Sequence, residues 1–182
     1  MLAAEGLDFR DLIFVDEFAA NLDMSRPCGR ALPGERVVER KPVNTPVNTS
    51  VVAALGIGEV VTSLCLEGAF DGESFCLFVE QGLCPLLKPG QIVLIDNGPI
   101  HKPRRVEEAI EAVGAHLIYL PAYSPDFNPI EEAFSKIKGH LKSAAARTRE
   151  ALDQALAKAL KLITPKDIRG WFEHAGYRFT FE

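Results

Sequence analysis

Three acidic residues in this chain could together bind a divalent metal ion. Asp16 and Asp96 each close a short apolar run, and Glu131 lies near the start of an amphipathic helical pattern. Neighbouring carboxylates repel one another without a cation, and one of them is then driven to keep its proton. Mg²⁺ binds carboxylate oxygens together with water and phosphate oxygens, and two such ions can stabilise the attacking and leaving oxygens of an in-line displacement. These residues therefore favour metal-dependent phosphoryl transfer.

Each of these residues also has a simpler interpretation. An aspartate at the end of a strand is often only a turn or cap residue. Glu131 follows Asn128 by three residues, so the two could form a capping box with no catalytic role. Lys138 and Lys142 share the Glu131 side of the helix and suit a polyanion, yet lysines on helices usually face only solvent. On residue types alone, a metal site and a structural role both stay open.

One amphipathic helix must position Glu131. Asn128 is expected to be its N-cap, with Pro129 at the first helical position and Glu131 at the third. The apolar residues of this segment share one arc of a helical wheel: Ile130, Ala133, Phe134, Ile137 and Leu141. The helix should therefore pack on a core through that arc and hold Glu131 at its rim.

The two aspartates should be positioned by strands of a sheet. Apolar runs predict buried strands at 11–16, 91–96 and 116–120, and a hairpin formed by 50–55 and 59–66. Further helices are expected at about 72–87, 103–113, 148–163 and 164–175, with Thr148 and Thr164 as caps of the last two. This order predicts a mixed α/β sheet with helices packed on it, whose strand ends form the functional rim. If the first and fourth strands are neighbours, Asp16 and Asp96 would lie side by side.

Composition limits the possible classes of protein. The chain has 182 residues, which suits one α/β domain. It contains no run of 18 apolar residues and its N-terminus has no signal-like pattern, so no membrane association is expected. Four cysteines without a C-x-x-C pair are expected to be reduced and mostly buried, in a cytoplasmic protein. The segment 21–47, rich in Arg, Pro and Gly, is expected to be an exposed connection.

The charge distribution bears on nucleic-acid binding. The net charge of −5 argues against strong sequence-independent affinity for DNA, because that affinity comes from Lys and Arg neutralising phosphates. Between Ser135 and Arg149, however, the only charged residues of fixed sign are basic: Lys136, Lys138, Lys142, Arg147 and Arg149. We therefore expect the isolated chain to bind DNA weakly and with little sequence preference.

Two blocks of sequence carry a resemblance to a known family. They are Asp96-Asn97-Gly98-Pro99-Ile100-His101-Lys102 and Tyr123-Ser124-Pro125-Asp126-Phe127-Asn128-Pro129-Ile130-Glu131, with 34 residues between Asp96 and Glu131. They resemble transposases of the Tc/mariner superfamily, and most of all the bacterial insertion-sequence branch with a DDE endonuclease domain. Asp16-Glu17, followed by Gly29-Arg30 and Pro33-Gly34-Glu35, fits the opening motif of that family. The resemblance runs from about Leu12 to Lys142.

The resemblance implies a fold, an activity and a site. The fold would be an RNase H-like mixed sheet flanked by helices, with Asp16, Asp96 and Glu131 as catalytic residues and ligands of two Mg²⁺ or Mn²⁺ ions. Such enzymes hydrolyse a phosphodiester at the transposon end and then use the freed 3′-hydroxyl to attack target DNA. Further residues are expected to orient a carboxylate, contact DNA or cap the helix: Asn97, His101, Tyr123, Asn128, Lys138 and Lys142. For His101, a plain surface histidine is an equal alternative.

The chain departs from the family pattern in a few places. It has Cys28 where an aromatic residue is usual and Ala122 where a second proline is usual. Full-length relatives carry N-terminal helix-turn-helix modules, whereas the first catalytic strand is expected here about a dozen residues in. We therefore expect residues 1–182 to be a single catalytic domain, with the helices from about residue 148 packed on it and the helix-turn-helix domain absent. A truncated copy, an isolated catalytic domain and the second of two overlapping frames are all consistent with this.

Partners and alternatives follow from the same resemblance. The expected partners are transposon-end and target DNA, a second copy of the chain in a homodimer, and an N-terminal DNA-binding partner from an overlapping frame. The protein would be cytoplasmic, and associated with the nucleoid when on DNA. One alternative is a non-catalytic truncated remnant that binds or regulates a partner transposase, against which the presence of all three acids argues. Another is a different metal nuclease on the same fold, against which the block from Tyr123 to Glu131 argues.

Overall fold

Five strands form one mixed sheet in a computed structural model of the chain, which describes residues 8–42, 48–121 and 125–177. The strands are β1 (Leu12–Ala20), β2 (Thr49–Gly56), β3 (Glu59–Glu67), β4 (Ile92–Ile95) and β5 (His116–Tyr119), and their order across the sheet is β3-β2-β1-β4-β5. The hairpin of β2 and β3 pairs antiparallel with β1, while β4 and β5 are parallel to it. The predicted strands and the predicted mixed α/β class are therefore confirmed.

The central strand β1 supplies both layers of the core. Leu12, Phe14 and Phe18 pack into one hydrophobic cluster, whereas Ile13 and Val15 pack into the other. This division follows from the period of two in a strand, which sends successive side chains to opposite faces of the sheet. Because both faces are apolar, both must be covered.

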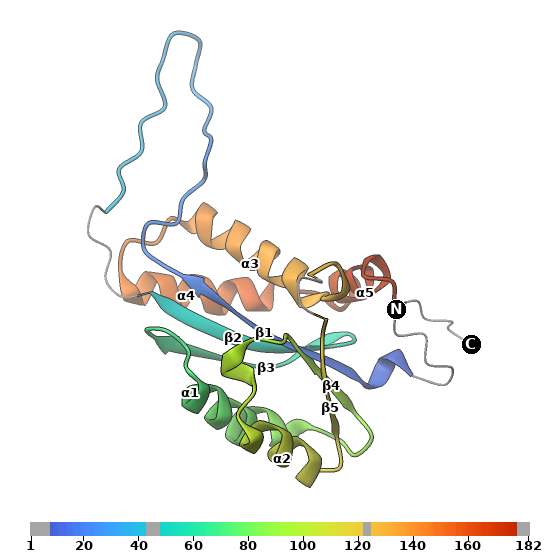
Figure 1. Cartoon of the computed structure of the whole chain (residues 1–182). Coiled ribbons are helices and arrows are strands. Elements are labelled where there is room, and N and C mark those ends of the chain that lie inside the picture. Colours follow the sequence, from blue (N-terminus) through green and yellow to red (C-terminus); the bar gives the residue numbers. More distant parts are fainter. Residues whose placement is uncertain (1–7, 43–47, 122–124, 178–182) are drawn as a thin grey trace.

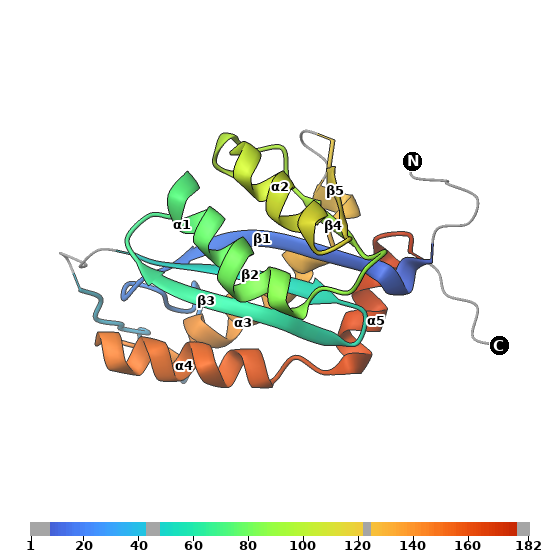
Figure 2. The ribbon, with the colours of Figure 1, turned by 90° about the horizontal axis from the view of Figure 1, so that it is seen from below.

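Helices cover the two faces unequally (Figures 1 and 2). One face carries α3 (Ile130–Ala144), α4 (Arg149–Lys161) and α5 (Pro165–His174), and the other carries α1 (Gly72–Leu77) and α2 (Arg104–Ala112). The whole predicted apolar arc of α3 is buried against the sheet. Thr148 and Thr164 cap α4 and α5 as predicted, and Thr164 forms a capping box with Asp167.

The helix predicted at 72–87 is helical but not uniformly so. After α1, the backbone passes through a π-helical stretch (Phe78–Leu83) and a 3₁₀ turn (Cys84–Leu86). Pro85 has no backbone N–H to donate, so an α-helical hydrogen-bond pattern cannot continue through it. The periodicity of apolar residues predicted the segment but carried no information on this change of pattern.

The expectation that Asp16 closes its strand is wrong. Asp16 lies inside β1, because the antiparallel partner β2 stays paired with β1 from Ile13 to Ala20. The parallel pairing with β4 is shorter and ends at the pair Val15–Ile95. Asp16 therefore lies where β1 loses one neighbour, while Asp96 lies just beyond the end of β4.

The described part of the connection between β1 and β2 projects from the body of the protein (Figure 1). Its described residues, 21–42, form neither helix nor strand and are mostly exposed, as predicted. All four cysteines are free, but only Cys76 and Cys84 are buried, so the expectation of mostly buried thiols is wrong for Cys28 and Cys65. Among the residues described, no helix combines the length and apolar character needed to cross a membrane.

Candidate active site

The sheet register brings two of the candidate acids together. Val15 pairs with Ile95, so the next residues along the parallel strands, Asp16 and Asp96, are neighbours at the end of that pairing. The expectation that the first and fourth strands are adjacent is confirmed. Glu131 lies in the first turn of α3.

The electrostatics of Asp16 involve the other two candidate acids. Burial raises the pKa of Asp16 to about 7, although a hydrogen bond from the Glu17 backbone N–H acts in the opposite direction. The negative charges of Glu17, Glu131 and Asp96 add to the increase in pKa. Asp16 therefore senses the charges of both other candidate acids, and its surroundings favour its protonated form.

Asn128 binds Asp16 and does not cap α3. Its Nδ2 donates a hydrogen bond to Asp16 Oδ2 at 2.9 Å across 112 residues of sequence, and its side chain is buried. The helix begins at Ile130 with Pro129 as N-cap, and no side chain caps it. The predicted N-cap role, and with it a capping box between Asn128 and Glu131, is wrong. The half-buried carboxylate of Asp16 needs a hydrogen-bond donor, which Asn128 supplies. The backbone N–H groups in the first turn of α3 can instead bind other acceptors.

Asp96 is held from two sides through the same oxygen. The Gly98 backbone N–H donates to Asp96 Oδ1 at 3.1 Å, and His101 Nδ1 contacts that oxygen as well. The other ring nitrogen of His101, Nε2, lies 3.0 Å from Glu17 Oε2. His101 is 1% exposed, so the alternative of a plain surface histidine is wrong.

His101 is buried between two carboxylates, and these surroundings set the direction in which its pKa is shifted. Burial by itself lowers the pKa of His101, but the hydrogen bond and charge of Glu17, helped by Asp96, outweigh it and raise the pKa overall. The ring also packs on Phe75, with 4.4 Å between centroids, and the Tyr119 hydroxyl donates to the His101 carbonyl at 3.1 Å. The sequence singled out Glu17 only as part of a motif, and it contained no signal for Phe75 or Tyr119.

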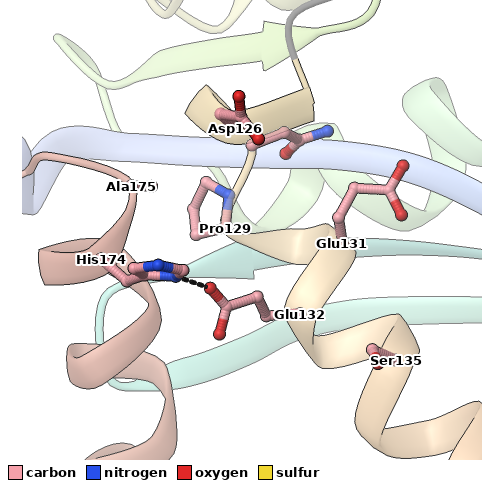
Figure 3. Close-up of a pocket in the computed structure, with 8 residues that line it drawn as sticks. Asp126, Pro129, Glu131, Glu132, Ser135, His174 and Ala175 are labelled. Atoms are coloured by element: carbon pink, nitrogen blue, oxygen red, sulfur yellow. Dashed lines mark hydrogen bonds and ion pairs between the residues drawn. The ribbon is translucent and has the colours of Figure 1, made fainter.

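A pocket of about 360 Å³ lies beside Glu131, between the start of α3 and the end of α5. Figure 3 shows Glu132 turned towards His174 of α5, with which it forms an ion pair, whereas Glu131 points away from that pair. Asp126 and Ser135 also line the pocket. Adjacent residues in the first turn of α3 thus have different roles. Glu132 pairs with α5, whereas Glu131 lies at the rim of the helix.

The remaining predicted residues are less closely gathered. Asn97 is exposed in the loop after β4, and Lys142 is exposed towards the end of α3. Lys138 lies nearer the site, with Nζ 5.3 Å from the centre of the Phe18 ring. Tyr123 lies outside the described residues, as does Ala122.

The three acids offer a suitable ligand set for a hard divalent cation. Carboxylate oxygens are the donors that Mg²⁺ prefers and that Mn²⁺ accepts. A cation would also offset the burial and the neighbouring negative charges that raise the pKa of Asp16. In residues 8–42, 48–121 and 125–177, however, no three or more His, Cys, Asp or Glu side chains are grouped as ready ligands of a metal ion. The donor types therefore fit a metal, and an ion would have to draw the carboxylates together.

Comparison with known proteins gives a family and a fold. The family profile described as DDE superfamily endonuclease matches residues 11–153. A search of curated proteins finds no match.

Similar solved structures include several of Mos1 transposase. The paired-end complex with the left transposon end has a TM-score of 0.74 at 17% identity, over 93% of this chain and 52% of that chain. The paired-end complex with Mn has a TM-score of 0.76 at 17% identity, over 93% and 54% of the two chains. The Mos1 catalytic domain has a TM-score of 0.64 at 16% identity, over 93% and 79%. The chain thus spans about half the length of the Mos1 chains in the complexes, and it shares the RNase H-like fold of the catalytic domain.

Proposed function

The chain belongs to the DDE superfamily of endonucleases, and from this we propose that it is the catalytic domain of a DNA transposase. It would hydrolyse a phosphodiester at a transposon end and join the freed 3′-hydroxyl to target DNA. The observation that carries the proposal is that the end of the β1–β4 pairing brings Asp16 beside Asp96, and that the charges of Asp96 and Glu131 both act on Asp16. Mos1, whose catalytic domain has the same fold, is a transposase solved with transposon-end DNA.

Asp16, Asp96 and Glu131 are proposed to hold Mg²⁺ or Mn²⁺, as two ions. Structures of Mos1 paired-end complexes with Mg and with Mn support this choice of metal. When bound, the ions would supply Lewis-acid stabilisation of charge on the phosphate oxygens. The chain's own groups keep the ligands in place, since Asn128 holds Asp16 and the Gly98 N–H holds Asp96.

DNA is the proposed substrate, and it would approach along α3. Lys138 and Lys142 follow Glu131 on that helix and would contact phosphates, while Asn97 would lie in the loop beside Asp96. Recognition of a particular terminal repeat would require a DNA-binding module from the rest of the protein or from a partner. A homodimer would bring two transposon ends together.

Metal-dependent nicking and strand transfer on terminal-repeat DNA, with an N-terminal DNA-binding module supplied, test this function. Asp96→Asn and Glu131→Gln should each lower the rate on the order of 100-fold or more, because several kcal/mol of charge stabilisation are lost. Glu111→Gln, an exposed position on α2, is the matched control and should stay near wild type. Wild-type nicking by Asp96→Asn and Glu131→Gln would show the assignment of the acids to be wrong.

The alternative is a remnant that only regulates a partner transposase. The lack of a preformed cluster of metal ligands among the described residues is the observation that favours it. In the same assay, a chain that cuts no DNA at any Mg²⁺ or Mn²⁺ concentration, yet inhibits an active transposase, would establish this alternative.

A further inference from the structure

Glu17, His101 and Asp96 form a continuous chain of contacts from β1 to the loop after β4, and we propose that Glu17 is a positioning residue that orients Asp96 through His101. The inference rests on the proposed function, because it assumes that Asp96 is a metal ligand. It adds Glu17, which is neither one of the three candidate acids nor one of the residues expected to support them.

The contacts use both nitrogens of one imidazole. Nε2 of His101 lies 3.0 Å from Glu17 Oε2, and Nδ1 contacts Asp96 Oδ1. Glu17 and His101 are 84 residues apart in sequence, so the fold alone brings them together. The ring is 1% exposed, and therefore its nitrogens cannot exchange these partners for bulk water.

The surroundings of His101 leave its ring little freedom. Phe75 packs on it with 4.4 Å between ring centroids, and Tyr119 binds its backbone carbonyl. On the remaining side, a Cβ added to Gly98 would lie 3.3 Å from His101 Nδ1 and 3.1 Å from Asp96 Oδ1, closer than side chains normally approach. The place where the histidine meets the aspartate is thus closely packed, and glycine at position 98 makes room for it.

The effect on Asp96 follows from which oxygen is held. Both the Gly98 N–H and His101 Nδ1 contact Oδ1, which fixes the rotation of the carboxylate. The second oxygen, Oδ2, takes part in neither contact and is left for a metal ion. Partners of this kind orient metal ligands, and their loss typically costs about 10- to 100-fold in metal affinity.

Glu17 acts from the other face of the strand. Asp16 binds Asn128 beside α3, whereas Glu17, one residue later, reaches a histidine that packs on Phe75 of α1. Because successive strand residues point to opposite faces, Glu17 is turned from the side on which Asp16 meets α3. Its contact with Asp96 therefore runs through the imidazole, which makes it a positioning residue and not a further ligand.

Mn²⁺ binding by the whole chain, followed by electron paramagnetic resonance titration without DNA, tests the inference. Glu17→Ala and His101→Asn should each weaken Mn²⁺ binding by about 10- to 100-fold. Glu17→Gln should retain most of the affinity, because its amide oxygen can still accept a hydrogen bond from Nε2. His116→Asn, at an exposed histidine on β5, is the control and should bind like wild type. Melting temperatures of the metal-free variants separate loss of folding from loss of orientation.

A second measurement needs no metal. Imidazole ¹⁵N NMR, or a crystal structure, of Glu17→Ala should show His101 released from Asp96. If His101 keeps its wild-type signals and its contact with Asp96 in Glu17→Ala, the inference is overturned, whether or not Mn²⁺ binds. If wild type binds Mn²⁺ and Asp96→Asn abolishes that binding while Glu17→Ala does not weaken it, the inference fails and the proposed function stands. If Asp96→Asn binds Mn²⁺ as wild type does, it is the proposed function that fails.

Discussion

Asp16 has surroundings that favour its neutral form, and these same surroundings suit a bound cation. Burial and the charges of Glu17, Glu131 and Asp96 raise its pKa to about 7. Two hydrogen bonds nevertheless hold its carboxylate, one from the Glu17 backbone N–H at 2.8 Å and one from Asn128 at 2.9 Å. Hydrogen-bond donors thus orient the carboxyl group, while burial and neighbouring charges disfavour its ionised form. A cation bound nearby would offset both of these effects.

At position 98, a single methyl group should disturb Asp96. In Gly98→Ala the added Cβ would lie 3.1 Å from Asp96 Oδ1 and 3.3 Å from His101 Nδ1, so one of these groups must shift by a few tenths of an ångström. The Gly98 backbone, at φ −70°, accepts alanine without strain, so folding should be retained. We expect weaker Mn²⁺ binding, by up to about 10-fold, at a nearly unchanged melting temperature.

The control for this variant is Gly139→Ala. Gly139 lies on α3, where an added Cβ meets nothing within 4 Å, and alanine there should stabilise the helix by about 1 kcal/mol. Titration calorimetry with Mn²⁺ and thermal melting of both variants provide the comparison. Equal Mn²⁺ affinities in Gly98→Ala, Gly139→Ala and wild type would contradict the close packing at Asp96.

At the scale of elements, side-chain contacts attach α5 and a residue just past it to the start of α3, which carries Glu131. Lys136 pairs with Asp167 at 2.6 Å, Glu132 pairs with His174, and the hydroxyl of Tyr177, just past α5, donates to the Phe127 carbonyl at 2.8 Å. Of these contacts, the pair between Glu132 and His174 lies at the pocket beside Glu131 (Figure 3). The helix α5 lies beyond residues 11–153, which match the family, yet it bears directly on the position of Glu131.

Asp167→Asn should weaken this attachment in a pH-dependent way. The hydrogen bond from Lys136, and then those from Thr164, lower the pKa of Asp167 to about 2. A carboxyl whose pKa is lower in the folded state stabilises the fold above its unfolded pKa of about 4 and loses that contribution as the pH falls towards 2. We therefore expect the variant to be less stable by about 1 kcal/mol at pH 7, with the difference shrinking below about pH 4.

Urea unfolding of wild type and Asp167→Asn between pH 3 and pH 7 measures this difference. Glu173→Gln, an exposed acid on the same helix, serves as the control and should show no such pH dependence. A stability difference that stayed constant down to pH 3 would mean that the charge of Asp167 is not what fastens α5.

At the scale of the whole molecule, most of the basic run at 136–149 serves the fold. Lys136 pairs with Asp167, Arg147 with Glu39 at 3.1 Å, and Arg149 with Glu67 at 2.9 Å. Arg147 also donates to the carbonyl oxygens of Leu22 and Met24, where the long connection leaves β1. These charges are therefore partly neutralised within the protein, which agrees with the expectation of weak DNA binding from a net charge of −5.

Replacing Lys142 by alanine should therefore affect DNA binding, whereas replacing Lys136 should affect stability. Lys142→Ala should weaken DNA binding and reduce the slope of log affinity against log salt by about 1, because a phosphate contact is lost. Lys136→Ala should instead lower the free energy of unfolding by a few tenths to about 1 kcal/mol, because an ion pair to α5 is lost. Fluorescence anisotropy with duplex DNA at several salt concentrations, together with urea unfolding, separates the two. An unchanged salt slope in Lys142→Ala would exclude it from the DNA surface.

The sequence by itself determined the elements and the chemical type of the site. Alternating and helical apolar patterns are local, so the five strands, the helices α2 to α5 and the buried arc of α3 could all be predicted within a few residues. The threonine caps of α4 and α5 are local as well, since each needs only a hydroxyl and a backbone N–H three residues away. The proposal of Asp16, Asp96 and Glu131 as the site acids likewise rests on motif and spacing.

Only the tertiary structure decided what each polar side chain contacts. Asn128 has the residue type of an N-cap but meets Asp16, because the packing of α3 on β1 places a half-buried carboxylate within its reach. Glu17 looked like a companion of Asp16 but turns to His101, because the β1–β4 register and the alternation of strand faces send it the other way. Both partners are more than 80 residues away in sequence. Local patterns carry no information about contacts at that separation, and the energetic need of a buried polar group for a partner is met by whichever group the fold brings near.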